Sequence, residues 1–425
     1  MIAFASLFLG LVAGVLPVSV IVSAPVARVE FLLDDRPAGR VWKKPWSVTI
    51  DLGEQLEPHE LTALAFDEKG HEIGRARQWL NLPRPPAEIE IILEHDRTGR
   101  ATAAHLAWAS LTAPRPARIS LTLDGRPLSV SGSRRAALPR YDTSTTHVLS
   151  AEAEFASGVR SRSDVVLGGG SAGDAKSELT AVALRLRAEL PSVTAEAQRP
   201  ALSKKGQPMT VAAVDHGAAD VLIVRDPGSE EALLRLGRAG PLRDFRLDRQ
   251  DAVRIVWPMA RSADLSEQER AELLDTTRYL TARESGFYFL LTAIRYVEGY
   301  DSPRRFADAV AVAGLQAYAS RSRRAVVLVL GGSRPDNSRY APAQVLRYLE
   351  RIHVPLHVWC LEGVGANCPS QWEGREDVSS LFRLREAVAR LKGDLETQRV
   401  VWLEGKHLPQ DIELSDKAAG VEFAR

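Results

Sequence analysis

The stretch that decides the fold of this chain is Arg324-Ala-Val-Val-Leu-Val-Leu330, a continuous run of β-branched residues and leucine. Such a run predicts a strand that is buried on both faces of a parallel sheet. Gly331 to Ser338 ends the strand with turn-forming residues, and Pro342 to Ile352 has apolar residues at helical spacing. A second apolar run, His353 to Cys360, follows. This order of strand, turn, helix and strand predicts an α/β domain.

The same alternation extends over the last part of the chain. We expect strands at 253–257, 325–330, 354–359 and 399–403, and helices at 266–283, 303–318, 342–351 and 378–391. Right-handed crossovers would stack these strands into one parallel sheet with helices on both faces. The sequence therefore predicts a Rossmann-like α/β domain over residues 246–425.

The first half of the chain carries an internal repeat. Leu33-Asp-Asp-Arg-Pro37 recurs as Leu123-Asp-Gly-Arg-Pro127, and His59-Glu-Leu-Thr-Ala63 is matched downstream by His147-Val-Leu-Ser-Ala151. In each copy an alternating strand precedes an Asp-rich turn that suits a tight hairpin. We therefore predict two immunoglobulin-like β-sandwich units, over residues 25–92 and 93–190, with Pro83 to Pro86 as a stiff linker.

A fainter third copy of the hairpin is Gly206-Gln-Pro208, which is followed by the apolar strand Ala219 to Val224. We interpret residues 191–245 as a partial β unit or as connecting strands that lead into the α/β domain. A length of 425 residues is in keeping with this multidomain organisation.

Charge and composition exclude several classes of partner. The chain has 55 Lys and Arg against 54 Asp and Glu, a formal net charge of +1, and no long run of either sign. This balance indicates neither a nucleic-acid footprint nor a membrane-surface patch.

The N-terminal segment is apolar, and no charged side chain occurs before Arg28. Residues 1–24 fit a cleaved secretory signal, an uncleaved membrane anchor or a buried N-terminal strand. We expect an exported protein, periplasmic or secreted, that contacts a membrane only through this segment if it is retained. The two cysteines, Cys360 and Cys368, either close a short disulfide loop or remain free thiols.

Several segments in their order resemble one family. The apolar N-terminus, Leu123 to Pro127, Gln78 to Pro86, Asp308 to Gly314 and Arg324 to Leu330 are similar to the bacterial secreted proteins called acidobacterial vWFA-related proteins. The resemblance implies a von Willebrand factor A-like (vWA) domain behind β units. Such domains bind a divalent cation through an Asp-x-Ser-x-Ser loop after the first strand, a Thr, and an Asp after a later strand.

The loops that correspond to this cation site lack most of its oxygen ligands. With 253–257 as the first strand, the loop 258–264 has no Asp-x-Ser-x-Ser, 300–302 reads Tyr-Asp-Ser, and Gly331-Gly332 replaces the last Asp. We predict a degenerate site with no metal and no cofactor. Asp142-Thr-Ser-Thr-Thr146 matches the motif by letters, but it follows no apolar strand, so we interpret it as a turn.

No arrangement typical of an enzyme is found. The chain has no Gly-x-Ser-x-Gly elbow and no His-Glu-x-x-His helix, and His353 with His357 are too few ligands for zinc. We predict that the protein is not an enzyme.

The function that these observations favour is protein–protein contact or envelope assembly through a metal-free vWA-like domain displayed by β-sandwich units. Ligands approach open α/β sheets at the carboxyl ends of the strands, so we expect a partner-binding rim there. Its residues would be Arg261, Asp301, Arg334 and Asp336. The alternative is a cation-dependent ligand-binding protein with a rebuilt metal site of Asp264, Asp301 and Asp336.

Overall fold

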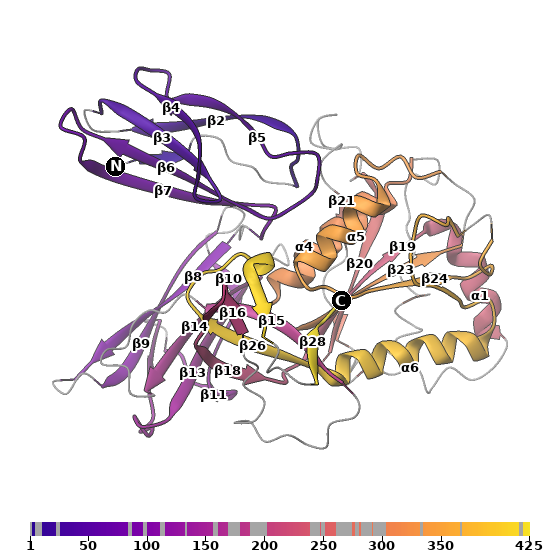
Figure 1. Ribbon diagram of the computed structural model, residues 1–425. Helices are drawn as coiled ribbons and strands as arrows, with labels where there is room; N and C mark the ends of the chain where they lie inside the picture. Colours follow the sequence, from indigo (N-terminus) through magenta and orange to yellow (C-terminus); the bar gives the residue numbers. More distant parts are fainter. Residues whose placement is uncertain are drawn as a thin grey trace.

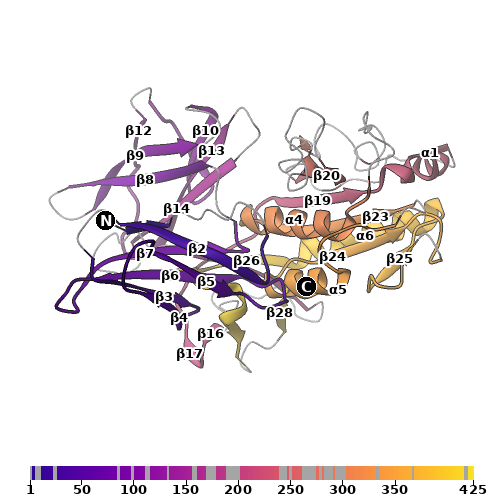
Figure 2. The same cartoon turned by 90° about the horizontal axis from the view of Figure 1, so that it is seen from above.

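The computed structural model shows two N-terminal β-sandwiches on one side, an α/β region on the other, and a third β unit between them (Figure 1). Figure 2 shows the same division from above. The residues that the structure describes are 2–4, 11–22, 26–83, 87–96, 100–110, 115–131, 134–155, 160–168, 179–187, 202–238, 247, 251–260, 274–276, 280–281, 291, 303–331, 335–365, 368–415 and 420–425.

The first sandwich packs two antiparallel sheets, of strand order β1-β2-β5 and β4-β3-β6-β7, face to face. Alternate residues such as Val18, Phe31 and Leu61 point between the sheets and are buried. The strands are β1 (Ile2–Phe4), β2 (Val15–Val22), β3 (Arg28–Leu33), β4 (Arg36–Val41), β5 (Ser47–Asp51), β6 (His59–Phe66) and β7 (Glu72–Leu80).

The apolar N-terminal segment is part of this sandwich. Its residues form β1 and β2, and Ile2, Val18 and Val20 lie in the core. The described residues of this segment, 2–4 and 11–22, pack as part of the sandwich, because alternating apolar side chains cover the second sheet. The first β unit thus begins before residue 25.

The second sandwich repeats the design with sheets of order β12-β9-β8 and β11-β10-β13-β14. Leu121, Leu149 and Phe155 are among its buried core residues. The strands are β8 (Ala87–His95), β9 (Ala101–Ser110), β10 (Pro116–Leu123), β11 (Arg126–Leu128), β12 (Arg135–Ala137), β13 (Thr146–Phe155) and β14 (Arg160–Gly168).

The repeated sequence motif forms the same local structure in both sandwiches. In the first, Oδ2 of Asp34 lies 2.7 Å from Nδ1 of His59, and Oδ1 accepts the Glu60 amide at 2.8 Å. In the second, Asp124 makes the matching contacts with His147 at 2.7 Å and with the Val148 amide at 2.9 Å. The hairpin aspartate therefore joins its turn to the neighbouring strand, which explains why Asp and His recur together.

The third β unit is built from two stretches that are far apart in sequence. Its sheets have the orders β18-β26-β15-β28 and β17-β16-β27. The strands are β15 (Leu179–Leu186), β16 (Leu202–Lys204), β17 (Gln207–Pro208), β18 (Val211–Asp215), β26 (Gln398–Glu404), β27 (Ile412–Leu414) and β28 (Val421–Phe423), with the 3₁₀ turn η2 (Pro409–Asp411). The α/β region is therefore an insertion between β18 and β26.

The α/β region contains a parallel sheet whose strands lie in the order β20-β19-β23-β24-β25. Two short strands, β21 and β22, extend it by pairing antiparallel with β20. The bounds are β19 (Ala219–Arg225), β20 (Ala252–Ala260), β21 (Leu274–Thr276), β22 (Leu280–Thr281), β23 (Arg323–Leu330), β24 (Leu356–Cys360) and β25 (Arg375–Asp377).

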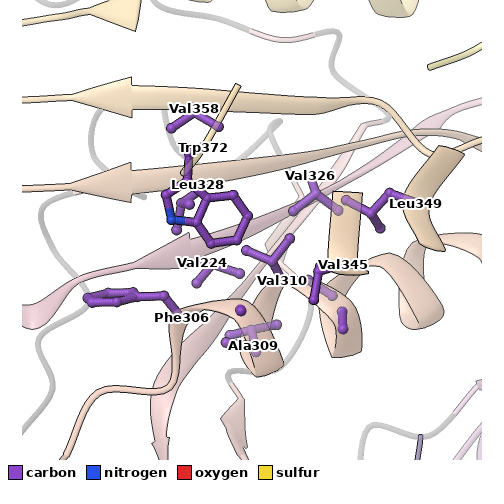
Figure 3. Packing of buried hydrophobic residues seen from close by; sticks show 14 of the residues in the cluster. Val224, Phe306, Ala309, Val310, Val326, Leu328, Val345, Leu349, Val358 and Trp372 are labelled. Carbon is purple, nitrogen blue, oxygen red and sulfur yellow. The ribbon is translucent and has the colours of Figure 1, made fainter. Parts of the chain in front are cut away.

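Helices cover both faces of this sheet. The helices are η1 (Pro227–Ser229), α1 (Glu230–Arg238), α4 (Phe306–Ala319), α5 (Pro342–Arg351) and α6 (Leu381–Thr397). Alternate residues of β23 feed two cores: Val327 faces α1 and α6, whereas Val326 and Leu328 face α4 and α5. Figure 3 shows the second core, where Val310 and Val345 meet Val326. The predicted strand 324–330, buried on both faces, is confirmed.

The structure corrects three of the expected elements. Within 266–283, the described residues form β21 and β22 rather than helix, because the open edge of β20 offers unpaired backbone groups. The strand at 399–403 exists, but it joins the third β unit antiparallel to β15. The parallel sheet starts at Ala219 and not at residue 246, because β19, in the region 191–245, is its first strand along the chain and lies between β20 and β23.

Two buried arginines at the start of β23 fasten the insertion to the third β unit. Arg323 donates to the Gly217 carbonyl at 2.6 Å and to the Leu395 carbonyl at 2.8 Å. These carbonyls lie next to the two chain crossings, the points where the chain passes between the third β unit and the α/β region. The guanidinium of Arg323 also lies 3.5 Å from the buried carboxylate of Asp251. Arg324 exchanges backbone hydrogen bonds with the side chain of Gln398 at 2.9 and 3.0 Å.

The first sandwich also contacts the α/β region. Tyr340 donates its hydroxyl hydrogen to the Leu11 carbonyl at 2.7 Å, and Tyr348 donates to the Asn81 carbonyl at 2.8 Å. Leu56 enters the apolar core between α4 and α5. The first sandwich and the α/β region are thus held together by tertiary contacts.

His357 joins four elements through charge. Its Nε2 lies 3.2 Å from Asp394 on α6, and its Nδ1 lies 3.8 Å from Glu376 on β25. Asp394 in turn lies 3.4 Å from Arg185 on β15. Burial lowers the pKa of His357, but these two carboxylates outweigh burial and raise the pKa above its usual value of 6.5.

We predict that Arg323→Met destabilises the protein by about 3–5 kcal/mol, because it removes a cation from beside the buried Asp251 carboxylate. Urea unfolding followed by tryptophan fluorescence measures the loss. Arg385→Met, which changes an exposed residue of α6, is the matched control and should change stability by less than about 0.5 kcal/mol. Equal effects of the two substitutions would contradict the role of Arg323.

The raised pKa of His357 predicts a pH dependence of stability. The stabilising contribution of the protonated ring is complete below about pH 6.5 and is lost as the pH rises through the raised pKa. Comparing urea midpoints at pH 6 and pH 8 should show a smaller change for His357→Gln than for the wild type. His71→Gln, at an exposed position, should keep the wild-type pH dependence, and the proposal fails if His357→Gln also keeps it.

Candidate functional site

The candidate site lies at the carboxyl edge of the parallel sheet. β19 comes first in the chain, and its neighbours β20 and β23 lie on opposite sides of it. Between β19 and β23 the strand order therefore reverses, and open α/β sheets bind ligands in the crevice at such a point. Asp226 follows β19 and Gly331 follows β23, so these two residues border the crevice.

Asp226 is held in place by the turn that it begins. Its Oδ1 accepts the Gly228 amide at 2.9 Å, and its carbonyl accepts the hydroxyl of Ser229 at 2.5 Å. Its own amide donates to the Val329 carbonyl of β23 at 3.0 Å. The side chain of Asp226 is only 2% exposed, so this carboxylate is inside the protein.

Arg304 supplies a cation to this buried carboxylate. Its Nε lies 3.6 Å from Oδ1 of Asp226, and its side chain is 1% exposed. The guanidinium also contacts the sulfur of Met259 at the end of β20. The pair thus joins the carboxyl ends of β19 and β20 to the segment that leads into α4.

Burial raises the pKa of the Asp226 carboxyl group, and the amides of Gly228 and Gly331 together with Arg304 oppose this shift. A buried carboxylate is costly unless hydrogen bonds and a cation compensate it. Both kinds of compensation come from the chain itself at this site.

The described residues at the end of β23 are tightly packed. A Cβ atom placed on Gly331 would lie 3.0 Å from the Cβ of Ser229 and 3.2 Å from Leu361. A larger side chain at this position would require these neighbours to shift, so glycine suits it best. Among the described residues, Ser229 and the ion pair thus border the crevice that a ligand would enter.

The predicted rim residues are only partly within the described chain. Arg261, Asp301 and Arg334 lie outside the described residues, as does Asp264, so their prediction stays untested. Asp336 caps α4, since its carboxylate accepts the amides of Phe306 at 2.9 Å and Ala307 at 3.2 Å. The negative charge of this carboxylate stabilises α4, because the N-terminus of a helix carries a partial positive charge.

The outer part of the edge carries a disulfide and two exposed apolar side chains. Cys360 and Cys368 are bonded, with Cα atoms 5.7 Å apart, which resolves the two alternatives in favour of the disulfide. Val364, within the bridged loop, is 49% exposed, and Phe382, at the start of α6, is 68% exposed. Their sequence neighbours are both close to Asp377: Arg383 pairs with this carboxylate, and a Cβ on Gly363 would be 3.8 Å from it.

Within the described part of the chain, no group of three His, Cys, Asp or Glu side chains is arranged to hold a metal ion. Asp142 accepts the amide of Ser144 at 2.9 Å and its hydroxyl at 2.7 Å, which confirms the predicted turn. His353 stacks on Phe423, with ring centroids 4.0 Å apart, and does not share a strand with His357.

Sequence reasoning missed Asp226 and Arg304. That reasoning took 253–257 as the first strand of the parallel sheet, and therefore compared the loop after that strand with Asp-x-Ser-x-Ser. The first strand of the sheet is β19, and the loop that follows it is Asp226-Pro-Gly-Ser229-Glu230. The signal that was available is the Asp directly after the apolar run 219–225. Nothing near Arg304 in sequence marks it, because its partner is distant along the chain.

The comparisons with known proteins give only distant structural likenesses. No family model and no curated protein matches the sequence. Similar solved structures include the fibronectin(III)-like modules of Clostridium thermocellum CbhA (19% identity, 19% of this chain and 93% of that chain, TM-score 0.17). The central fibronectin-III array of RIM-binding protein is 10% identical over 44% of this chain and 77% of that chain, with TM-score 0.21. Proximal thread matrix protein 1 from the mussel byssus is 10% identical over 42% of this chain and 47% of that chain, with TM-score 0.26.

At these scores the likeness says nothing of function. The fold is nevertheless plain from the strand pairing: antiparallel β-sandwich units of the fibronectin III and immunoglobulin kind precede an α/β region with a five-stranded parallel sheet. Among the described helices, none has both the length and the apolar character needed to cross a membrane.

We predict that Arg304→Met costs about 3–5 kcal/mol of stability, because it removes one partner of a buried ion pair. The double variant Asp226→Asn with Arg304→Met should lose less unfolding free energy than the two single variants lose in sum. We expect the difference to be at least about 1 kcal/mol. Arg347→Met, on the exposed side of α5, is the control in the same urea unfolding assay. Strict additivity in this cycle would show that the two side chains do not interact.

Proposed function

We propose that this protein is a non-enzymatic, exported protein that binds a protein partner through the carboxyl edge of its α/β region. In this proposal the α/β region is a vWA-like domain without a metal, displayed by the β-sandwich units. The observation that carries the proposal is the exposure of two apolar side chains, Val364 and Phe382, at the same sheet edge as the buried ion pair of Asp226 and Arg304.

Exposed apolar groups at a fixed position favour contact with another protein. The disulfide limits the motion of the loop that carries Val364, so less conformational entropy is lost when a partner binds it. Phe382 is surrounded by charged neighbours such as Arg383 and Asp377. An apolar centre with a polar rim is the usual composition of a protein interface.

A buried ion pair in the crevice also speaks against small-molecule chemistry there. An active site requires a cleft with room for a substrate and groups that can react with it. At this edge the buried carboxylate already has a guanidinium beside it, and Ser229 donates its hydroxyl hydrogen to a carbonyl. The alternative cation site gains no support from Asp336, whose carboxylate caps α4.

The disulfide supports an oxidising location. Disulfides persist outside the cytoplasm and are rare within it. We therefore propose a periplasmic or secreted location. Alkylation of intact cells before lysis, followed by mass spectrometry, should find Cys360 and Cys368 unmodified and bridged; alkylated thiols at both positions would contradict this location.

The partner-binding proposal predicts the result of affinity capture from the native envelope fraction. The wild-type chain should retain a protein that the double variant Val364→Ala with Phe382→Ala retains at least about tenfold less, because the apolar centre of the interface is removed. Ile73→Ala, which truncates an exposed apolar residue of the first sandwich, should retain as much as the wild type. Equal capture by all three chains would rule out this edge as the interface.

A further inference from the structure

The outer face of the sheet β4-β3-β6-β7 carries an exposed aromatic side chain that the proposed function does not use. Trp42, directly after β4, is 62% exposed. The chain buries most of its other tryptophans, namely Trp46, Trp257, Trp359, Trp372 and Trp402. Exposure of so large an apolar ring is unfavourable unless something covers it.

The ring of Trp42 lies close to the guanidinium groups of two arginines. Glu30 and Arg40 are cross-strand partners, and Arg28 and Trp42 continue the same face one step along each strand. Arg28 donates to Oε1 of Glu30 at 3.0 Å, and Nε of Arg40 lies 2.9 Å from the same oxygen. Their guanidinium carbons lie 5.8 and 5.9 Å from the centre of the Trp42 ring.

Both guanidinium groups lie within cation–π range of the indole, and both lie close to the Glu30 carboxylate. Phe66, the cross-strand partner of Arg28, has its ring centre 4.1 Å from the guanidinium carbon of Arg28. Because Trp42 is 62% exposed, much of its ring is open to solvent and available as a stacking platform.

The rest of the face is charged and open. Arg75 pairs with Glu72 at 3.0 Å and Arg77 with Glu60 at 3.3 Å, and these arginine side chains are 46% and 57% exposed. Lys43 and Lys44 follow Trp42 and are exposed. Even with Asp67, Glu68 and Lys69 of the adjoining turn included, basic side chains outnumber carboxylates here.

We propose that this face binds a polysaccharide that contains acidic sugars, with Trp42 as the stacking platform. The apolar face of a sugar ring packs against an indole, and the guanidinium groups of arginine form paired hydrogen bonds with carboxylates. A sheet surface suits an extended polymer, since a chain that lies across the strands can reach Trp42, Arg40 and Arg75 together. The face is separate from the residues that contact the α/β region, such as Leu11 and Asn81.

The test is binding of the full-length protein to polygalacturonate, alginate and hyaluronate in affinity gel electrophoresis at low salt. We expect the wild type to be retarded by at least one of these acidic polymers. Trp42→Ala should weaken that binding by about tenfold or more, and Arg40→Gln should weaken it as well. Retardation should decrease with added salt, because arginine–carboxylate contacts are screened.

Two controls keep the proposal falsifiable. Phe382→Ala, on the distant α/β region, should bind the polymers like the wild type, and thermal unfolding should show that Trp42→Ala folds normally. When polygalacturonate binds, its fully methyl-esterified form should bind at least about tenfold more weakly, since its carboxylates are masked. Absence of binding to all three acidic polymers, equal binding by Trp42→Ala, or equal binding of the methyl-esterified polymer would overturn the proposal.

Discussion

The buried ion pair between Asp226 and Arg304 is the constraint on which the functional part of this structure depends. It lies at the point where the order of the parallel strands reverses, which is where α/β sheets ordinarily admit a ligand. A guanidinium near the carboxylate supplies the positive charge that a bound cation would otherwise bring. Gly331 packs closely against Ser229 beside this pair. In the proposed function, binding takes place at the periphery of this edge, where Val364 and Phe382 are exposed.

The position of this sheet edge relative to the β units depends on how the α/β region is inserted into the third β unit. Its two chain crossings lie between β18 and β19 and between α6 and β26, so the third β unit is complete only when both stretches meet. Arg323 bonds to backbone groups at both crossings. Contacts of Tyr340 and Tyr348 with the first sandwich add a second attachment. The α/β region is thus attached to the sandwiches at two places, in keeping with a domain that is presented to a partner.

Local patterns predicted local structure well and long-range structure poorly. The apolar run 324–330 could only be a strand buried on both faces, and the repeated Asp and His could be located because hairpins are short-range features. The run 399–403 was also a strand, but an apolar run does not state which sheet it joins. Residues 15–22 alternate in a way that suits a strand and are apolar enough for a signal, so sequence alone left both open. Asp226 and Arg304 meet only through tertiary folding, and no spacing rule could pair them.

The most direct test of the central claim is isothermal titration calorimetry of the full-length protein with Mg²⁺, Mn²⁺ and Ca²⁺. Since the carboxylate at the strand-order reversal already has Arg304 beside it, we expect no heat of binding from any of these ions up to millimolar concentration. Saturable heat at micromolar metal, abolished by Asp226→Asn, would show instead that this carboxylate binds a cation and would contradict the account.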